Sequence, residues 1–555
     1  MKKSLKITLA GALALFLLTG CAAAPASAGE SVSAAASTTQ TAPSASDPDT
    51  AVSRRDASGE YDAAEAVALS PDGDLTITEA GTYILSGEYE GMIVIEAGEE
   101  DKVQLVLENA TITNESGPAI YVRSADKVFL TAAEGTVNTI SDGSDYALTD
   151  GDTTPDAAVF SRDDLTINGS GKLTINGNYK HAVVSKDDLV ITAKDLTVNA
   201  QNVGLSGKDS VRLSEATVSI TAGSDGVRSE NGTDADKGFV SVADSTVTIT
   251  SGKDGIQAET VFTAENANIS ITSGGGSGAR SGDASESYKG IKTGVSITIN
   301  GGVYTIDSLD DAIHTNGSIL IRDGAFTLRS RDDGVHANEK AEIAGGTLNV
   351  TAYEGIEATY ILISGGDITI AASDDGVNAV RKSSAYTPTV EITGGTIDIT
   401  MGAGDTDGVD CNGNVIITGG TVSINGNSSF DYDGTATFTG GTVYVNGQQV
   451  STIPNQFMGG GPGGQGGFGG GPGNQGGFGG GPGGQGGFGG GPDGQGRGRG
   501  MHGDQDGATL PDAVAGATPD GRGGSDGQES IAWPFGGAEP PAGAPEPPTA
   551  PADGL

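Results

Sequence analysis

Residues 332–352 read DDGVHANEKAEIAGGTLNVTA, a pattern that indicates the fold class of the chain. It opens on two aspartates and a glycine and continues as two short alternating segments separated by Gly345 and Gly346. Successive side chains of a strand point to opposite faces, so Ile, Val and Leu point inward while Thr, Asn and Asp point outward. The pattern predicts short β-strands joined by tight turns, with glycines supplying positive φ at the corners.

The same motif returns along the chain. Copies begin at Asp311, Asp333, Glu354 and Asp375 in steps of 22, 21 and 21 residues, and the next follows 32 residues later at Asp407. Further copies begin at Asp225, Asp254, Lys289 and Asp433. A repeat of about 21 residues without helix-length patterns indicates an all-β fold, a parallel β-solenoid. With a spacing of about 4.8 Å, roughly 15 coils are expected between residues 75 and 450.

Composition agrees with this fold and excludes some functions. The chain of 555 residues contains 93 glycines, and each interior glycine costs a helix about 1 kcal/mol relative to alanine. A helical bundle is therefore excluded. The 72 acidic and 30 basic residues give a formal charge of −42. Such a charge repels phosphate backbones and attracts divalent cations, so no nucleic-acid partner is expected.

The two ends of the chain differ from the repeats. A basic start and a short apolar run predict a lipoprotein signal peptide over residues 1–20. Leu18-Thr19-Gly20-Cys21 resembles a bacterial lipobox, so Cys21 is the expected lipid anchor at the extracellular face of the membrane. An ordinary signal peptide, cleaved after Cys21, is the alternative.

Four regions follow from these patterns. After the signal peptide we expect a disordered tether over residues 21–70, the solenoid over 71–450 and a Gly/Pro-rich low-complexity tail over 451–555. The tail is interpreted as a spacer through the cell envelope, with association with the cell wall as an alternative. Because Cys21 is expected to carry lipid, Cys411 has no partner and no disulfide is predicted.

Stacked coils would turn the residue before the corner glycine into a column of mostly acidic side chains. Carboxylates about 5 Å apart repel each other by about 1 kcal/mol in water and by more in a partly dry site. Calcium ions, which prefer oxygen ligands, would relieve this repulsion, and several ions are expected. The candidate ligands are Asp310, Asp311, Asp332, Asp333, Glu354, Asp374, Asp375, Asp405, Asp407 and Asp410, with Asp225 and Asp254 as weaker ones. Plain Asp-Gly turn chemistry is the alternative, and Lys289 could neutralise its neighbours without metal.

A second column lies three residues further along each copy. It contains Arg228, Gln257, Lys292, His314, His336, Glu357 and Asn378, followed by Asp410. These residues alternate with buried Ile or Val, so we expect them to face outward and bind an extended polysaccharide; a plain solvated face is the alternative. His314 and His336 do not indicate zinc by spacing alone, because a third ligand of the usual type is missing.

Several motifs together resemble a known family. They are Glu134-Gly135-Thr136-Val137-Asn138, Ser161-Arg162-Asp163-Asp164-Leu165-Thr166-Ile167-Asn168-Gly169, Asp310-Asp311-Ala312-Ile313-His314, Asp332-Asp333-Gly334-Val335-His336-Ala337, Tyr353-Glu354-Gly355-Ile356-Glu357 and Asp374-Asp375-Gly376-Val377-Asn378-Ala379. The chain resembles, over residues 71–450, the bacterial surface carbohydrate-binding family typified by a cellulose- and acidic-sugar-binding β-helix protein of Clostridium thermocellum. The resemblance implies a right-handed, single-stranded parallel β-helix similar to pectate lyases, with bound calcium, affinity for cellulose and polygalacturonate, and no catalysis. The 32-residue step after Asp375 departs from the family pattern.

The leading functional hypothesis is a lipid-anchored, calcium-dependent polysaccharide-binding protein with no catalytic residue. A single tryptophan and 5% aromatic residues argue against a stacking platform for sugar rings. One alternative is a calcium-dependent polysaccharide lyase, for which Lys289, Lys292 or Arg331 would act as the base. The other is a passive adhesion rod at the cell surface.

Overall fold

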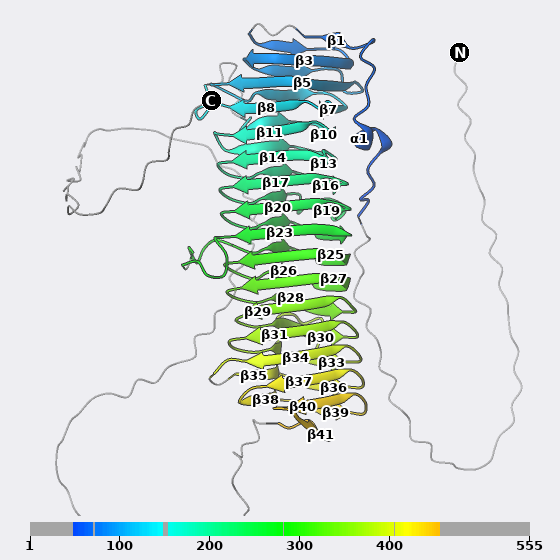
Figure 1. Cartoon of the computed structure of the whole chain (residues 1–555), viewed down its shortest axis with the longest axis vertical. Coiled ribbons are helices and arrows are strands. Elements are labelled where there is room, and N and C mark those ends of the chain that lie inside the picture. Colours follow the sequence, from blue (N-terminus) through cyan, green and yellow to red (C-terminus); the bar gives the residue numbers. More distant parts are fainter. Residues whose placement is uncertain (1–47, 70–72, 148–153, 281, 404–405, 456–555) are drawn as a thin grey trace, which may run out of the picture. The chain divides into compact units, whose positions relative to one another are not determined.

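The computed structural model describes residues 48–69, 73–147, 154–280, 282–403 and 406–455. The chain divides into two compact units, residues 1–466 and 467–555, and all described residues belong to the first. Figure 1 shows these residues as a tall stack of strands that follows the sequence from one end to the other. The predicted signal peptide, Cys21, the tether up to residue 47 and the tail from residue 456 lie outside the described residues.

Each coil of the stack contributes a strand to three faces. Face 1 follows the Asp-Gly motif, and each of its strands pairs in parallel with the equivalent strand of the next coil. Its strands in the described ranges are β2 (Leu75–Ile77), β4 (Ile93–Glu96), β6 (Ile120–Ser124), β9 (Ala157–Ser161), β12 (His181–Ser185), β15 (Leu205–Gly207), β18 (Val227–Ser229), β21 (Ile256–Ala258), β24 (Ile291–Thr293), β26 (Ile313–Thr315), β28 (Val335–Ile343), β30 (Ile356–Ile363), β32 (Val377–Ala379), β35 (Asp407–Cys411) and β38 (Ser428–Tyr432). These fifteen strands match the expected number of coils.

Faces 2 and 3 are built in the same way. Face 2 comprises β3 (Gly81–Glu90), β5 (Lys102–Asn114), β7 (Lys127–Ala132), β10 (Asp164–Gly169), β13 (Asp188–Ile191), β16 (Ser210–Ser214), β19 (Phe239–Ala243), β22 (Val261–Glu265), β25 (Ser296–Ser308), β27 (Ser318–Ser330), the second halves of β28 and β30, β33 (Thr389–Ile392), β36 (Asn414–Ile417) and β39 (Ala436–Phe438). Face 3 comprises the second halves of β3, β5, β25 and β27 with β8 (Val137–Asp142), β11 (Lys172–Gly177), β14 (Asp195–Ala200), β17 (Thr217–Ala222), β20 (Thr246–Ser251), β23 (Ala267–Ser273), β29 (Thr347–Ala352), β31 (Asp367–Ala372), β34 (Thr396–Met401), β37 (Thr421–Asn425) and β40 (Thr442–Val445). The described part ends with β41 (Gln448–Val450), which pairs antiparallel with β40. The prediction of an all-β, parallel, solenoid-like fold is confirmed.

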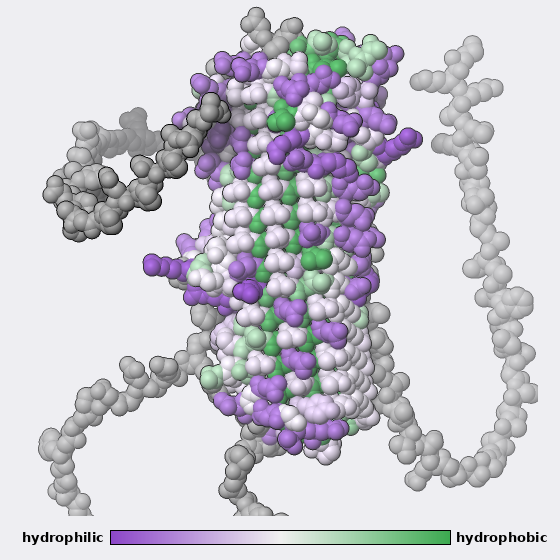
Figure 2. All heavy atoms as spheres, in the orientation of Figure 1, coloured by the Kyte–Doolittle hydropathy of each residue, from purple (hydrophilic) through white to green (hydrophobic). Residues whose placement is uncertain are grey.

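The core lies inside the three faces. On β17, β20 and β29 every second side chain is buried and the others are exposed, as the alternation predicts. Outward positions of these three strands carry Thr, Ser or Asn. Figure 2 shows pale, weakly polar rows alternating with hydrophobic ones in the middle of this side of the stack, whereas strongly hydrophilic residues gather along its edges, near its ends and at places in its lower half. Face 3 therefore presents a flat and nearly uncharged surface over these coils.

The corner glycines serve two different purposes. The second glycine of the Gly-Gly turns has a positive φ, 87° at Gly346 and 90° at Gly366, which favours glycine as expected. Gly334 and Gly376 of the Asp-Gly motif do not have a positive φ. A Cβ at Gly334 would lie 2.2 Å from Cγ1 of Val350, so this glycine is required by close packing. For the Asp-Gly corners the expectation of positive φ is therefore wrong.

Residues 48–66, named the N-terminal arm here, lie along the outside of face 2. The arm contains the helix α1 (Arg54–Ser58) and leads into β1 (Val67–Ala68), which pairs with β3. At its other end Pro48, Thr50 and Val52 border a cavity of about 200 Å³ against β16, β19, β22, β25 and β27. The described part of the predicted tether therefore differs from expectation, because it is docked on the solenoid. The Ser53–Asp56 capping box is the sequence signal that indicates this helix.

Asp56 anchors the arm. Its side chain is 6% exposed. Its Oδ1 lies 2.8 Å from the Lys127 Nζ and accepts a hydrogen bond of 2.6 Å from the Thr166 hydroxyl. Its backbone oxygen accepts a hydrogen bond from Thr192. Burial works to raise the pKa of Asp56, but Lys127 and the hydroxyl donors outweigh it and lower this pKa. The anchoring is therefore present above about pH 4 and lost only as pH falls through the lowered pKa.

We expect Asp56→Ala to release the arm, because Lys127 would lose its closest partner in a site that is only 14% exposed. Loss of such a partner costs about 3 kcal/mol. Trypsin should then cleave at Arg54 and Arg55 at least about 10-fold faster, since cleavage of an opened segment follows its open population. Asp62→Ala, a change at an exposed residue of the same arm, serves as the control. Equal cleavage rates for both variants would contradict the anchoring role.

No helix in the described residues is long and apolar enough to span a membrane.

Cys411 is a free thiol in this part of the chain and is completely buried. Burial raises its pKa to about 11, so it is not a reactive thiol.

Candidate functional site

The acidic column exists and is in register. Backbone hydrogen bonds link the motif of each coil to the next: Gly334 N–H donates to the oxygen of Glu354, and Gly355 N–H donates to the oxygen of Asp375, both at 2.9 Å. The same bond joins Gly376 to Asp407. Carboxylates that are 21 to 32 residues apart in sequence are therefore neighbours along one edge of face 1.

Several column residues have a structural role that sequence reasoning missed. The Asp225 carboxylate accepts the backbone N–H of Asp254 at 3.2 Å, and Asp254 accepts that of Lys289 at 2.7 Å. Asp225 also pairs with Arg228 at 3.3 Å, and Asp254 lies 3.8 Å from the Lys292 Nζ. These two aspartates thus join coils and have cationic partners, which fits the alternative of turn chemistry better than metal binding.

Lys289 neutralises the next part of the column. Its Nζ lies 2.7 Å from the Asp310 carboxylate and 3.3 Å from that of Asp311. Burial favours the neutral amine, but the two carboxylates outweigh it and raise the pKa of Lys289. For Asp311, burial is outweighed by Lys289 and by a hydrogen bond from His314, so the Asp311 pKa lies well below its usual value. Asp332 lies in the same group as Asp310 and Asp311.

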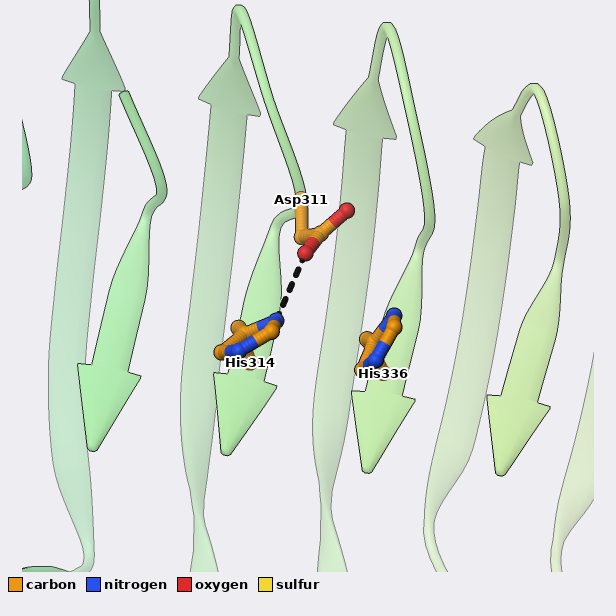
Figure 3. A group of neighbouring side chains, drawn as sticks. All are labelled: Asp311, His314 and His336. Atoms are coloured by element: carbon orange, nitrogen blue, oxygen red, sulfur yellow. Dashed lines mark hydrogen bonds and ion pairs between the residues drawn. The ribbon is translucent and has the colours of Figure 1, made fainter. Parts of the chain in front are cut away.

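Two histidines continue this cluster on β26 and β28. Their rings stack with centroids 4.5 Å apart, and Figure 3 shows them on adjacent strands with Asp311 beside them. The Nδ1 of His314 lies 2.7 Å from the Asp311 Oδ2. The Nδ1 of His336 lies 2.7 Å from Asp333 and 3.0 Å from Glu357. The spacing of the two histidines did not reveal a third group beside them. The structure places carboxylates from the same coil and from the next coil in that position.

The electrostatics of the two rings differ. Burial lowers the pKa of His314 more than Asp311 raises it. Burial also opposes charge on His336, but Asp333 and Glu357 outweigh it and raise the His336 pKa well above its usual value. Burial and the Asp311 charge raise the pKa of Asp333 well above normal.

The 32-residue step contributes a further cation. Lys382, within the insertion after β32, places its Nζ 3.1 Å from the Glu357 Oε2. The insertion is held by backbone N–H groups of Lys382 and Ser383, which donate to the Thr359 hydroxyl. Burial tends to raise the Glu357 pKa, but His336 and Lys382 outweigh it and lower this pKa. Sequence analysis identified the insertion but not its contact with the second column.

The next group has a different character. Glu354, Asp374 and Asp375 can direct carboxylate oxygens to positions within 4.8 Å of one another. Within the described ranges, no Lys, Arg or His forms an ion pair with these three carboxylates. Burial and the charge of Glu357 raise the pKa of Glu354 to about 8. Burial and the neighbouring acids, Asp410 first among them, raise the pKa of Asp375 to about 7.

Asn378 lies in this group with one atom unsatisfied. Its Nδ2 donates to the Glu354 carboxylate at 2.8 Å, whereas its buried Oδ1 has no hydrogen-bond partner among the described residues. Asp410 lies beyond it on β35, and burial together with Asp407 and Asp431 raises its pKa to about 6. Asp405 lies outside the described residues. We name Glu354, Asp374, Asp375, Asn378 and Asp410 the oxygen cluster.

The second column is in register but is not an open face. Backbone pairing aligns its members from Arg228 to Asp410. Four of them are nevertheless buried, with exposures of 3 to 8%: His314, His336, Glu357 and Asn378. His314, His336 and Asn378 are hydrogen-bonded to residues of the acidic column. Glu357 is paired with Lys382. The expectation of an outward face is wrong for these four, whereas Arg228, Gln257, Lys292 and Asp410 are partly exposed.

Two of the three residues considered for lyase chemistry, Lys289 and Arg331, are engaged elsewhere. Lys289 is 8% exposed and its raised pKa keeps the amine charged, which is the wrong state for a base. The Arg331 guanidinium donates to the backbone oxygen of Ala279 at 3.2 Å.

The comparisons with known proteins fit this solenoid. Residues 71–334 and 320–450 match the family described as carbohydrate-binding domain-containing protein. The chain belongs to this family. This confirms the resemblance drawn from the motifs and supports a polysaccharide as the partner.

Two known proteins are similar to parts of the chain. A carbohydrate-binding domain-containing protein of Acetivibrio thermocellus is 33% identical over 129 residues, which are 23% of this chain and 45% of that relative. The chain thus spans less than half of the relative. A solved structure, the gadolinium derivative of the polysaccharide lyase-like protein from C. thermocellum, is 31% identical and covers 43% of this chain and 96% of its own, with a TM-score of 0.37.

Proposed function

We propose that this protein is a lipid-anchored, extracellular polysaccharide-binding protein that depends on calcium and does not catalyse a reaction. The observation that carries the proposal is the family match over most of the solenoid. The coil would be a right-handed, single-stranded parallel β-helix, because parallel crossover connections are right-handed in about 98% of cases. The anchor at Cys21 rests on the lipobox-like sequence alone.

The oxygen cluster fits a calcium ion. It offers carboxylates from successive coils together with the unpaired amide oxygen of Asn378, and calcium takes six to eight oxygen ligands in flexible geometry. A bound cation would remove the repulsion that raises the pKa values of Glu354 and Asp375. Asp407 lies beside Asp410 and belongs to the same acidic group. When bound, the ion would supply positive charge that attracts a uronate carboxylate to a strongly acidic protein.

Two glycan classes suit two parts of the surface. An acidic polymer such as polygalacturonate would approach the partly exposed Glu354 and Asp374, with the more buried Asp375 beside them, through calcium. A neutral polymer such as cellulose carries no charge, and the outward Thr and Ser side chains of face 3 would suit its hydroxyl groups. These residues belong to the pale rows of Figure 2. Calcium dependence is accordingly expected for the first class only.

The proposal predicts that chelation abolishes binding of polygalacturonate and leaves cellulose binding in place. In a pull-down, removal of calcium should lower retention of polygalacturonate at least about 10-fold, and Asp374→Asn with Asp375→Asn should do the same in the presence of calcium. Loss of two ligand charges from a calcium site weakens it strongly. Asp195→Asn, at an exposed carboxylate on face 3, is the matched control.

Three outcomes would contradict this function. Retention of polygalacturonate that is unchanged by chelator would remove the role of calcium. Release of unsaturated uronate products during long incubation would instead indicate a lyase. No binding to any glycan, with or without calcium, would favour a passive rod.

A further inference from the structure

The His314–His336 cluster carries an inference separate from calcium and from glycan binding. Unlike the oxygen cluster, it combines two imidazoles with carboxylates. All three of Asp311, His314 and His336 are at most 3% exposed, and their ligand atoms lie within 4.8 Å of one another. Imidazole nitrogen suits zinc, copper, iron and nickel, whereas sets of carboxylates suit calcium and magnesium. The donor types therefore divide the column into two parts that favour different metals.

The orientation of the rings provides a second observation. The Nε2 of His314 lies 3.2 Å from the Oδ1 of Asn316, and the Nε2 of His336 lies 3.1 Å from the Oδ1 of Asn338. With the amides in these orientations each Nε2 carries the hydrogen, because an amide oxygen only accepts. In a neutral ring the lone pair is then on Nδ1, which faces a carboxylate at 2.7 Å in both cases. A lone pair facing a carboxylate requires a cation between them.

That cation is either a proton, held on His336 or on a carboxyl group in keeping with the raised pKa values of His336 and Asp333, or a metal ion shared by both rings. Two protonated rings would repel each other, because they stack at 4.5 Å. One metal ion between the Nδ1 atoms would satisfy both rings at once. Metal-binding histidines typically donate their other N–H to an oxygen acceptor that fixes the ring, and Asn316 and Asn338 fulfil this role here.

We propose that His314, His336 and Asp311, with Asp333 beside them, form a binding site for a zinc-like transition-metal ion. Ligands of a tetrahedral zinc ion lie about 3.3 Å apart. The corresponding contacts of His314 with Asp311 and of His336 with Asp333 are 2.7 Å, so a modest widening admits the ion. Lys289 keeps Asp310 as a partner at 2.7 Å when Asp311 turns to the metal. The exposed Asp332 groups with Asp310 and Asp311, so a carboxylate at the surface lies next to the proposed ligand Asp311.

Cobalt(II) is a suitable probe because it takes the place of zinc and its visible absorption reports nitrogen ligands. We expect the full chain, purified without a polyhistidine tag, to bind one cobalt ion with visible bands that zinc removes and calcium does not. His336→Gln should weaken cobalt binding by more than the about 10- to 100-fold that loss of an outer partner costs. Asn338→Ala should weaken it within that range, because the ring remains but loses its fixed orientation.

Two control variants separate this site from others. His181→Gln changes a buried histidine whose Nδ1 accepts the Val203 N–H at 3.2 Å, and it should leave cobalt binding unchanged. Asp374→Asn in the oxygen cluster should impair calcium-dependent glycan binding and leave the cobalt spectrum intact, so failure of one proposal does not affect the other. Absence of cobalt binding to the wild type, or equal affinity for the wild type and His336→Gln, would overturn the inference. Should His336→Gln not fold, as judged by circular dichroism, unchanged affinity in Asn338→Ala would overturn it.

Discussion

In the presence of a chelator, the melting temperature is expected to fall as the pH is raised from about 5 to about 8, and calcium is expected to restore it. The pKa values of Asp375 and Glu354 are raised to about 7 and about 8 by burial and by neighbouring acids. A carboxyl group whose pKa is raised in the folded state contributes most below its unfolded pKa, and this contribution is lost as the pH rises through the folded pKa. For Asp375, which is 9% exposed, the effect is on the order of 3 kcal/mol.

Scanning calorimetry at several pH values, with chelator or with calcium, tests this expectation. Asp375→Asn should flatten the pH profile, since an amide does not titrate and its oxygen can still accept the Asp407 N–H, a contact of 2.9 Å in the native protein. Asp195→Asn should keep the slope, because this residue lies on the exposed side of face 3. A melting temperature that stays constant or rises over this pH range in chelator would contradict the picture of crowded, partly protonated carboxylates.

The second large effect concerns the Asp-Gly corner. We expect Gly334→Ala to destabilise the fold by about 3 kcal/mol, because overpacking of a close contact typically costs 1–3 kcal/mol or more. The added Cβ would lie 2.2 Å from Val350 and 2.7 Å from the backbone oxygen of Gly355. The backbone cannot move away easily, since the Gly334 N–H is bonded to Glu354 in the next coil at 2.9 Å.

Urea denaturation of two alanine variants measures this effect. Gly278→Ala is the matched control, because a Cβ at Gly278 meets nothing within 4 Å. The midpoint should drop for Gly334→Ala and stay near the wild-type value for Gly278→Ala. Similar midpoints for both variants would show that the corner tolerates a side chain and that packing does not explain the repeated glycine.

The repeat made much of the fold predictable. A period near 21 and strict alternation are local patterns, and they specify strands, turns and the register that places Asp333, Glu354 and Asp375 in one column. Burial was less predictable, because it depends on which side chains cover a position from outside. His336 alternates with buried Val335 and was expected to face solvent, yet Glu357 from the next coil and Asp333 enclose it.

Long-range partners were also hidden from the sequence. Lys382 reaches Glu357 from an insertion that interrupts the repeat, and no spacing rule connects the two. The N-terminal arm has a composition typical of a linker, but Asp56 contacts Thr166 and Thr192, more than 100 positions further along the chain. A capping box reveals a helix and not the surface on which it docks.

The course of the arm also determines which interactions would bear a force applied to its N-terminal end. The arm runs back outside face 2, from the cavity bordered by Pro48 to β1, so the described chain starts beside the middle coils. A pull on this end would act in shear along the hydrogen bonds and the ion pair of Asp56. The terminal coil would therefore bear no load, and would not unfold strand by strand, until the N-terminal arm had detached from face 2.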